Sequence, residues 1–195
     1  MPDPVALGFD TSAAHCAAAL LRGDAVLAEA SEDMTKGQAE RLFPLLEGLL
    51  ADAGLSWQDL AVIGVGIGPG NFTGIRIAVA AARGLALSLG IPAVGVTATE
   101  AAAHDLPRPC RVVLPLRGDQ VVWQDFDERS GPPRQAAAAE LPPGPAPAAP
   151  AVPAAVAIAR IALTRRADPG PRPAPLYLRP ADAKPARDAP PLILP

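Results

Sequence analysis

Proline is spread unevenly along this chain of 195 residues, and its distribution limits where regular structure can form. Five of the 25 prolines precede residue 100 and twenty follow it. Proline lacks a backbone N–H and has a fixed φ angle, so it interrupts helices and central strands. The first half of the chain can therefore be regular, whereas much of the second half cannot.

The first hundred residues alternate apolar segments with turn residues, in the order β-β-β-α-β-α-β-α. Short β-compatible segments between turns predict an antiparallel meander at the start. Leucines at helical spacing then predict an amphipathic helix, with Pro44 in its first turn or at a kink. The whole pattern predicts an α/β fold with a mixed sheet. The expected strands span 5–9, 16–21, 25–30, 60–68 and 91–96, and the expected helices span 38–54, a segment that closes at Gly90, and 97–106.

The second half predicts a smaller and less regular unit. Residues 110–116 and 121–126 predict a hairpin that weakly repeats the first meander. The Pro/Ala-rich segment 131–153 is interpreted as a linker or loop rather than as packed core. One more helix is expected over 154–163, followed by an extended, proline-rich end.

Charge and cysteine usage narrow the class of protein. The formal net charge of −3 does not fit a chain that binds nucleic acid over its whole surface. Seven Lys/Arg and only three Asp follow residue 159, which favours a solvated basic tail over one that touches RNA. The isolated Cys16 and Cys110 suit a reducing cytoplasm. We see no secretion signal, and the uncharged stretch 141–159 holds six prolines, so we expect a soluble cytoplasmic protein with no membrane helix.

The most unusual segment is the glycine loop GVGIGPGNFTG, residues 64–74. A dinucleotide fingerprint needs glycines at i, i+2 and i+5, which no glycine of the loop satisfies, and a P-loop needs a lysine that the loop lacks. Backbone N–H groups could still bind an anion. The favoured interpretation is a tight strand-to-helix turn with glycines at positive φ, and Asn71 or Thr73 as the helix N-cap.

The helix after this loop carries a stripe of small residues. They recur every four positions, so another helix could approach closely. The residues alone favour packing inside the chain over a face for a partner. The stripe and its flanking residues are Gly74, Ile75, Ala78, Val79, Ala82, Ala86 and Gly90.

Residues that could carry chemistry are sparse. His15 and His104 do not have the spacing of metal ligands, and no HxxH, HxxxH or CxxC occurs. Asp10 could hold Mg²⁺ or a water, but an Asx-type turn with Thr11 and Ser12 is favoured. No serine lies in a GxSxG elbow and no carboxylate pair stands out. We therefore assign no catalytic and no metal-binding residue.

Three motifs together resemble the bacterial TsaB (YeaZ) family: LGFDTSAAHCAAALL, GIGPGNFTGIRIAVAAARGLAL and PLYLRPADAKPA. The loop of that family usually reads GPGSFTGLRIG, so Asn71 and Ala78 are mild departures. The RLFPLLEGLL helix also fits, including Pro44. The resemblance is strong over 5–105 and 176–186 and thin between them. The family's motif loop corresponds to Gly68, Pro69, Gly70, Asn71, Phe72, Thr73, Gly74 and Arg76.

The resemblance implies an actin/Hsp70/sugar-kinase-like (ASKHA) α/β fold of two related lobes with mixed sheets. The lobes would span 1–105 and 106–195, the second shortened by segment 131–153. The family helps to make N6-threonylcarbamoyladenosine beside the anticodon of tRNAs that read ANN codons. Its members do not perform the transfer. They pair with their paralog TsaD, which carries the metal-binding HxxxH and does the chemistry.

The resemblance also implies partners. In the family, two N-terminal-lobe helices form a four-helix bundle with the same helices of TsaD or of a second TsaB, which favours the partner face over internal packing. An ATPase, TsaE, joins the pair. We expect no cofactor of the chain's own, ATP or ADP only at an interface, tRNA contact mainly through the complex, a homodimer when alone, and Asp10, Thr11 and Ser12 as a vestigial phosphate turn. The expected partner-binding residues are Leu42, Leu45, Leu46, Leu49, Gly74, Ile75, Ala78, Val79, Ala82 and Ala86.

Two other functions remain open at this point. An ATP-dependent kinase or carbamoyltransferase of the same fold would need a phosphate loop in each lobe and a metal site. A self-associating structural module would have no role with tRNA, and co-purification with a TsaD-like protein would exclude it. Arg76 and Arg83 are interpreted only as solvated or interface charge.

Overall fold

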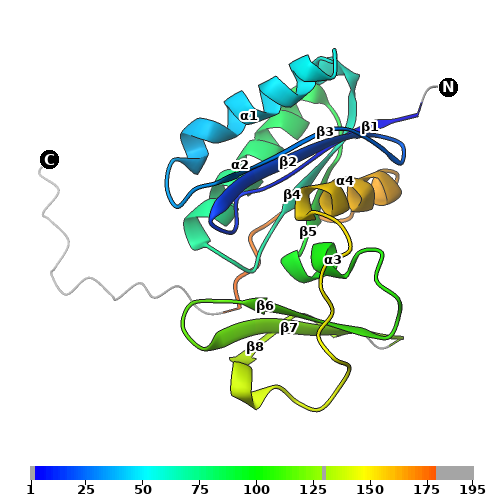
Figure 1. Ribbon diagram of the computed structural model, residues 1–195. Coiled ribbons are helices and arrows are strands. Elements are labelled where there is room, and N and C mark those ends of the chain that lie inside the picture. The colour runs from blue at the N-terminus through cyan, green and yellow to red at the C-terminus, as the bar shows by residue number, and fades with distance from the viewer. Residues whose placement is uncertain (1–2, 129–130, 179–195) are drawn as a thin grey trace, which may run out of the picture.

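The computed structural model describes residues 3–128 and 131–178, which form two sheets and the helices packed on them (Figure 1). The larger sheet has the strand order β3-β2-β1-β4-β5. β1 pairs antiparallel with β2 and parallel with β4, so this sheet is mixed, as predicted. Its strands are β1 Val5–Asp10, β2 His15–Arg22, β3 Ala25–Asp33, β4 Leu60–Gly66 and β5 Ala93–Val96.

Helices cover both faces of the larger sheet. α1 and α2 lie on one face, and α3 and α4 lie on the other side, between the two sheets (Figure 1). Successive side chains of a strand point to opposite faces. Leu7 and Phe9 of β1 therefore join the core with the leucines of α1, while Ala6 joins the core with α4. The helices are α1 Gln38–Asp52, α2 Phe72–Leu89, α3 Ala98–Ala103 and α4 Ala154–Arg165.

α4 lies far along the chain yet packs on the larger sheet. Two strand glycines allow its close approach, because a Cβ on Gly8 would lie 2.5 Å from the carbonyl oxygen of Ala155, and one on Gly64 would lie 2.7 Å from that of Ile158. A division of the chain at residue 105 stays a prediction. The helix that completes one face of the larger sheet comes from beyond that boundary.

The smaller sheet is antiparallel throughout, with the order β6-β7-β8. Among the described residues it repeats the meander of β1 to β3 without the parallel strands that follow in the larger sheet, apart from an isolated parallel bridge between Arg111 and Pro147. The second lobe is thus shortened, as expected, but its sheet is not mixed. Its strands are β6 Cys110–Pro115, β7 Gln120–Phe126 and β8 Arg134–Ala137.

The Pro/Ala-rich segment is more ordered than a linker, so that interpretation of 131–153 is wrong in part. β8 pairs with β7, and a 3₁₀ turn follows over Ala138–Glu140. Buried Arg111 then forms two hydrogen bonds of 2.6 and 2.7 Å with Asp125 and donates a third, of 2.5 Å, to the carbonyl oxygen of Pro142. Proline keeps its carbonyl acceptor although it lacks an N–H, so an arginine can fix such a segment.

The remaining elements follow the predicted order with shifted ends. Pro44 lies inside α1, beyond its first turn, on the exposed side. A further 3₁₀ turn spans Trp57–Asp59. The described part of the predicted extended end, residues 172–178, contains no helix or strand, and the rest of the basic tail lies outside the described residues.

Candidate functional site

The residues predicted to contact a partner form the core of the chain itself. Nine of the ten are buried, and Ala86 is half-buried. Leu46 and Ala78, for example, belong to the same buried cluster as Leu7 of β1. That residue assignment is corrected, because the small stripe lets α2 lie close to its own sheet and α1.

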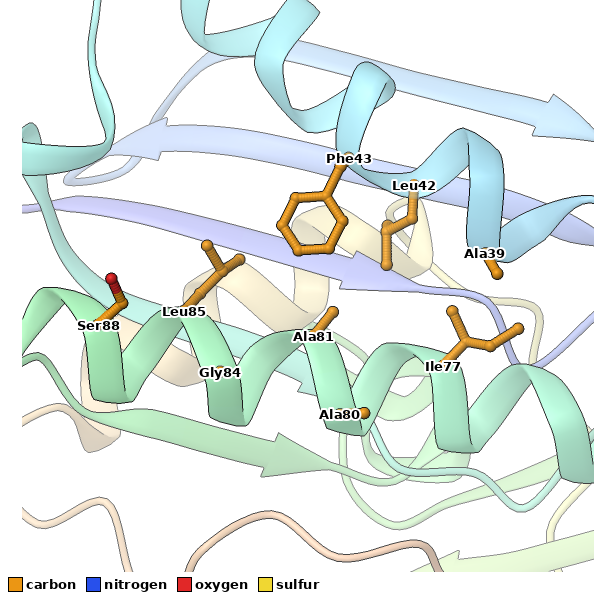
Figure 2. Close-up of a pocket in the computed structure, with 9 residues that line it drawn as sticks. All are labelled: Ala39, Leu42, Phe43, Ile77, Ala80, Ala81, Gly84, Leu85 and Ser88. Atoms are coloured by element: carbon orange, nitrogen blue, oxygen red, sulfur yellow. The ribbon is translucent and has the colours of Figure 1, made fainter.

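An open, apolar groove of about 490 Å³ lies between the same helices, and of the predicted partner-binding residues only Leu42 lines it (Figure 2). Phe43 and Leu42 project from α1 toward α2, where Ala81 and Leu85 face them. Phe43 is 41% exposed, and its ring centroid lies 6.4 Å from that of Trp57. The lining residues are Ala39, Leu42, Phe43, Ile77, Ala80, Ala81, Gly84, Leu85 and Ser88.

α2 is apolar on two faces. One face is buried in the core, and the other exposes a second small stripe, Ala80, Gly84 and Ser88, with the same spacing of four. A Cβ on Gly84 would meet nothing within 4 Å. Among the described helices, α2 is the one long and apolar enough to cross a membrane by length and composition, with a mean hydropathy of 1.4. That hydropathy reflects a helix with apolar residues both toward its own sheet and toward solvent.

The glycine loop is closed onto the Asp10–Ser12 turn by close backbone contacts. The Asn71 N–H donates to the carbonyl oxygen of Ser12 at 2.6 Å, and the Thr11 hydroxyl donates to that of Gly74 at 2.7 Å. A Cβ on Gly74 would overlap the carbonyl oxygen of Thr11, and one on Gly70 would overlap that of Ser12. Glycine is thus required here for close approach of two backbones.

Asn71 is the N-cap of α2, which confirms the first of the two predicted caps, Asn71 and Thr73. Its Oδ1 accepts hydrogen bonds of 3.0 Å from the N–H groups of Thr73 and Gly74. Gly68 has a φ of 89° in the turn before it. The N–H groups of Asn71, Thr73 and Gly74 are therefore bonded within the chain, which favours the structural interpretation of the loop.

Asp10, at the end of β1, is buried and already bonded at both oxygens. Oδ1 accepts from the Ser12 N–H at 3.2 Å, and Oδ2 accepts from the Ser12 hydroxyl at 2.9 Å. His15 Nε2 also lies 2.9 Å from Oδ2, and this contact raises the pKa of His15 above its ordinary value of 6.5. No group of three or more His, Cys, Asp or Glu that could hold a metal occurs within residues 3–128 and 131–178.

Arg76 forms a stack with two aromatic rings. Its guanidinium carbon lies 3.7 Å from the centroid of the Phe72 ring, and its Nε donates to the Tyr177 hydroxyl at 2.8 Å. The Phe72 and Tyr177 rings stack with centroids 4.8 Å apart. Both rings line a cleft of about 1,320 Å³ that Asp10 and His15 also line. Two of the resembling motifs therefore meet in space, a contact that their spacing of 101 residues hid from sequence analysis.

Comparisons with known proteins bear on what these features do. A family model described as "TsaD: tRNA N6-adenosine threonylcarbamoyltransferase" matches residues 27–125, which include both helices of the groove. An uncharacterized protein of Mycobacterium tuberculosis is 34% identical, over 92% of this chain and 93% of its own length. The tRNA threonylcarbamoyladenosine biosynthesis protein TsaB of Bacillus subtilis is 42% identical over 50% of this chain and 42% of its own length. TsaB of Escherichia coli is 31% identical over 62% of this chain and 54% of its own length.

A solved structure shares the fold. YeaZ from Pseudomonas aeruginosa superposes with a TM-score of 0.74 and 24% identity, covering 90% of this chain and 100% of that one. This likeness and the mixed five-stranded sheet confirm the predicted ASKHA-type α/β fold. The chain thus combines this fold with a closed glycine loop and an open apolar groove.

Proposed function

Because the chain belongs to the TsaB (YeaZ) family, we propose that it serves tRNA threonylcarbamoyladenosine biosynthesis as a partner subunit that performs no chemical step itself. In this role it binds a TsaD-like transferase through α1 and α2. TsaD then transfers threonylcarbamoyl from threonylcarbamoyl-AMP to the tRNA adenosine. The chain contributes an apolar surface that holds TsaD in its active conformation.

The groove between α1 and α2 is the observation that carries this proposal. A contiguous exposed apolar surface on a folded chain is typical of a protein-binding site. The exposed stripe Ala80, Gly84 and Ser88 lets a partner helix come close, and Phe43 offers an aromatic anchor of the kind that dominates interface energy. The same helices carry the contact that the family resemblance implies, through their outer residues instead of their buried ones.

The turn at Asp10 supports the absence of a catalytic step. Asp10 uses both oxygens to hold Ser12 and His15, and the α2 N-terminus is capped by Asn71. A phosphate would have to displace these contacts. We therefore propose that the chain has no cofactor of its own and that ATP or ADP binds only where it meets its partners.

The wider assembly follows from the same role. A TsaE-like ATPase joins the TsaD pair, and tRNA is contacted mainly through the complex in the cytoplasm. The groove also serves a homodimer when TsaD is absent, because a second copy presents the same apolar helices.

Ala80→Arg tests the proposed face. The new side chain would project into the groove, so we expect binding of TsaD from the same organism to weaken at least 100-fold in calorimetry or a pull-down. Ala167→Arg is the matched control, because Ala167 is exposed just after α4 on the other side of the sheet. Its binding should equal wild type. Equal binding by both variants, each with an unchanged circular dichroism spectrum, would reject this face.

A further inference from the structure

The open groove lies close to the place where the described part of the C-terminal segment is held. Tyr177 stacks on Phe72, the first residue of α2, and the Leu176 N–H donates to the carbonyl oxygen of Ile67 at 2.8 Å. Ile77, which lines the groove, comes little more than one helical turn after Phe72. The chain therefore leaves Leu178 near one end of the groove.

Residues 179–195 lie outside the described residues, and their sequence has two distinct parts. The first thirteen, RPADAKPARDAPP, are polar or proline-rich and contain three basic and two acidic residues. The apolar residues Leu192, Ile193 and Leu194 follow. The proposed function does not involve this apolar group.

The spacer is long enough to bring that group to the groove. A proline-rich segment extends about 3.1 Å per residue, so thirteen residues span up to about 40 Å. Gly84 lies twelve residues after Phe72 on α2, which is about 18 Å along a helix that rises ~1.5 Å per residue. The reach is about twice what is needed.

Charge favours the same path. Glu40 and Glu47 are exposed on α1, three residues before and four after Phe43, so they flank the groove. Arg179, Lys184 and Arg187 of the spacer carry the opposite charge, and Asp182 and Asp188 offset part of it, so the spacer has a net charge of +1. The attraction between exposed groups is modest and screened by salt, so it steers the segment more than it holds it.

We propose that Leu192, Ile193 and Leu194 dock in the groove between α1 and α2 of their own chain. Three apolar side chains fit a groove of about 490 Å³ lined by Phe43, Leu85 and small residues. A short flexible tether gives an effective concentration in the millimolar range, so even a millimolar intrinsic affinity leaves the groove substantially occupied. The docked segment is then an internal competitor of whatever partner binds there.

The docking itself can be tested on the chain alone. Cys16 and Cys110 are both buried, so a spin label can be directed to Pro195→Cys. We expect the label to broaden the amide NMR signals of Ala80, Gly84 and Ser88, and the broadening to persist when the labelled chain is diluted into excess unlabelled protein. Absence of broadening would overturn the proposal. Broadening that disappears on dilution would also overturn it, because it would come from a second copy.

A tip variant and a spacer variant provide the matched comparison. Leu192→Asp, Ile193→Asp and Leu194→Asp together should abolish the broadening. Ala181→Asp, Ala183→Asp and Ala186→Asp add the same charge to the spacer and should retain it. If both variants broaden the groove signals equally, the apolar group is not the docked segment and the proposal fails.

The competitive role rests on the proposed function and has its own readout. Freed of its competitor, the tip variant should bind TsaD about 2- to 10-fold more tightly than wild type, whereas the spacer variant should not. Unchanged affinity alongside clear broadening would overturn competition. If no form binds TsaD, the proposed function fails, while the NMR result still decides whether the segment docks.

Discussion

Asp10 and His15 form a hydrogen-bonded pair of side chains in the cleft. His15 Nε2 lies 2.9 Å from the Asp10 carboxylate, and Asp33 adds further negative charge nearby. Both acids favour the charged imidazolium, which is why the pKa of His15 is raised. A raised pKa in the folded state means that the protonated histidine stabilises the fold.

His15→Gln should make stability less dependent on pH. The stabilisation by His15 is fully present below its ordinary pKa of 6.5 and is lost as pH rises through its higher folded pKa. We expect wild type to exceed the variant by about 1 kcal/mol in unfolding free energy at about pH 6, with the gap closing by about pH 9. Urea unfolding across this range measures it. A gap that widens with rising pH would contradict the assignment.

At this scale the local turn could be predicted from the sequence, but the distant contacts could not. The Asx-type turn of Asp10 with Ser12 and the Asn71 cap depend on neighbouring residues, so short motifs predicted them. The stack of Arg76 with Tyr177 joins residues 101 positions apart. This stack forms only because the segment that carries Tyr177 folds back onto α2, and no local sequence pattern indicates that path.

α2 carries two stripes of small residues with the same spacing, one buried and one exposed. Its small stripe every four residues was recognised from the sequence, and the helix that it predicted is present. The stripe proved to be internal, because two stripes of the same spacing run along α2 and only the fold decides which one faces the sheet. The groove residues other than Leu42 were missed for that reason.

Alanine substitutions at two glycines of α2 should have opposite effects. At Gly74 the added Cβ would overlap the carbonyl oxygen of Thr11, so Gly74→Ala should cost about 1–3 kcal/mol. At Gly84 the added Cβ meets open space, so Gly84→Ala should stabilise the helix by about 0.5–1 kcal/mol. Thermal unfolding of both variants provides the comparison. Equal shifts of the two melting temperatures would refute the close contact at Thr11.

At the scale of the whole molecule, Arg111 connects two strands of the smaller sheet to the proline-rich segment. The Arg111 side chain ties β6 to Asp125 of β7 and to the carbonyl of Pro142, and the backbone carbonyl oxygen of Arg111 accepts from the Ala148 N–H at 2.9 Å. These contacts lead the proline-rich segment toward α4. Composition predicted a linker here because the segment is rich in prolines, which break regular structure. Composition cannot reveal that one arginine on another strand holds the segment in place.

Arg111→Met should loosen that connection. The variant keeps the apolar length of the side chain but leaves Asp125, whose pKa the arginine lowers, without its partner. We expect a loss of about 2–4 kcal/mol in unfolding free energy. Backbone amides that gain hydrogen-exchange rate should lie over 134–148. Protection of that segment at the wild-type level would show that Arg111 does not hold it.

The position of α4 also sets an order of events during synthesis. The ribosome makes all five strands of the larger sheet nearly seventy residues before the last turn of α4, because β5 ends at Val96 and α4 ends at Arg165. Until then, Ala6, Leu21 and Val62 have no helix to cover them. The nascent first lobe therefore carries a bare apolar face, and its final maturation waits for a helix translated almost at the end of the described chain.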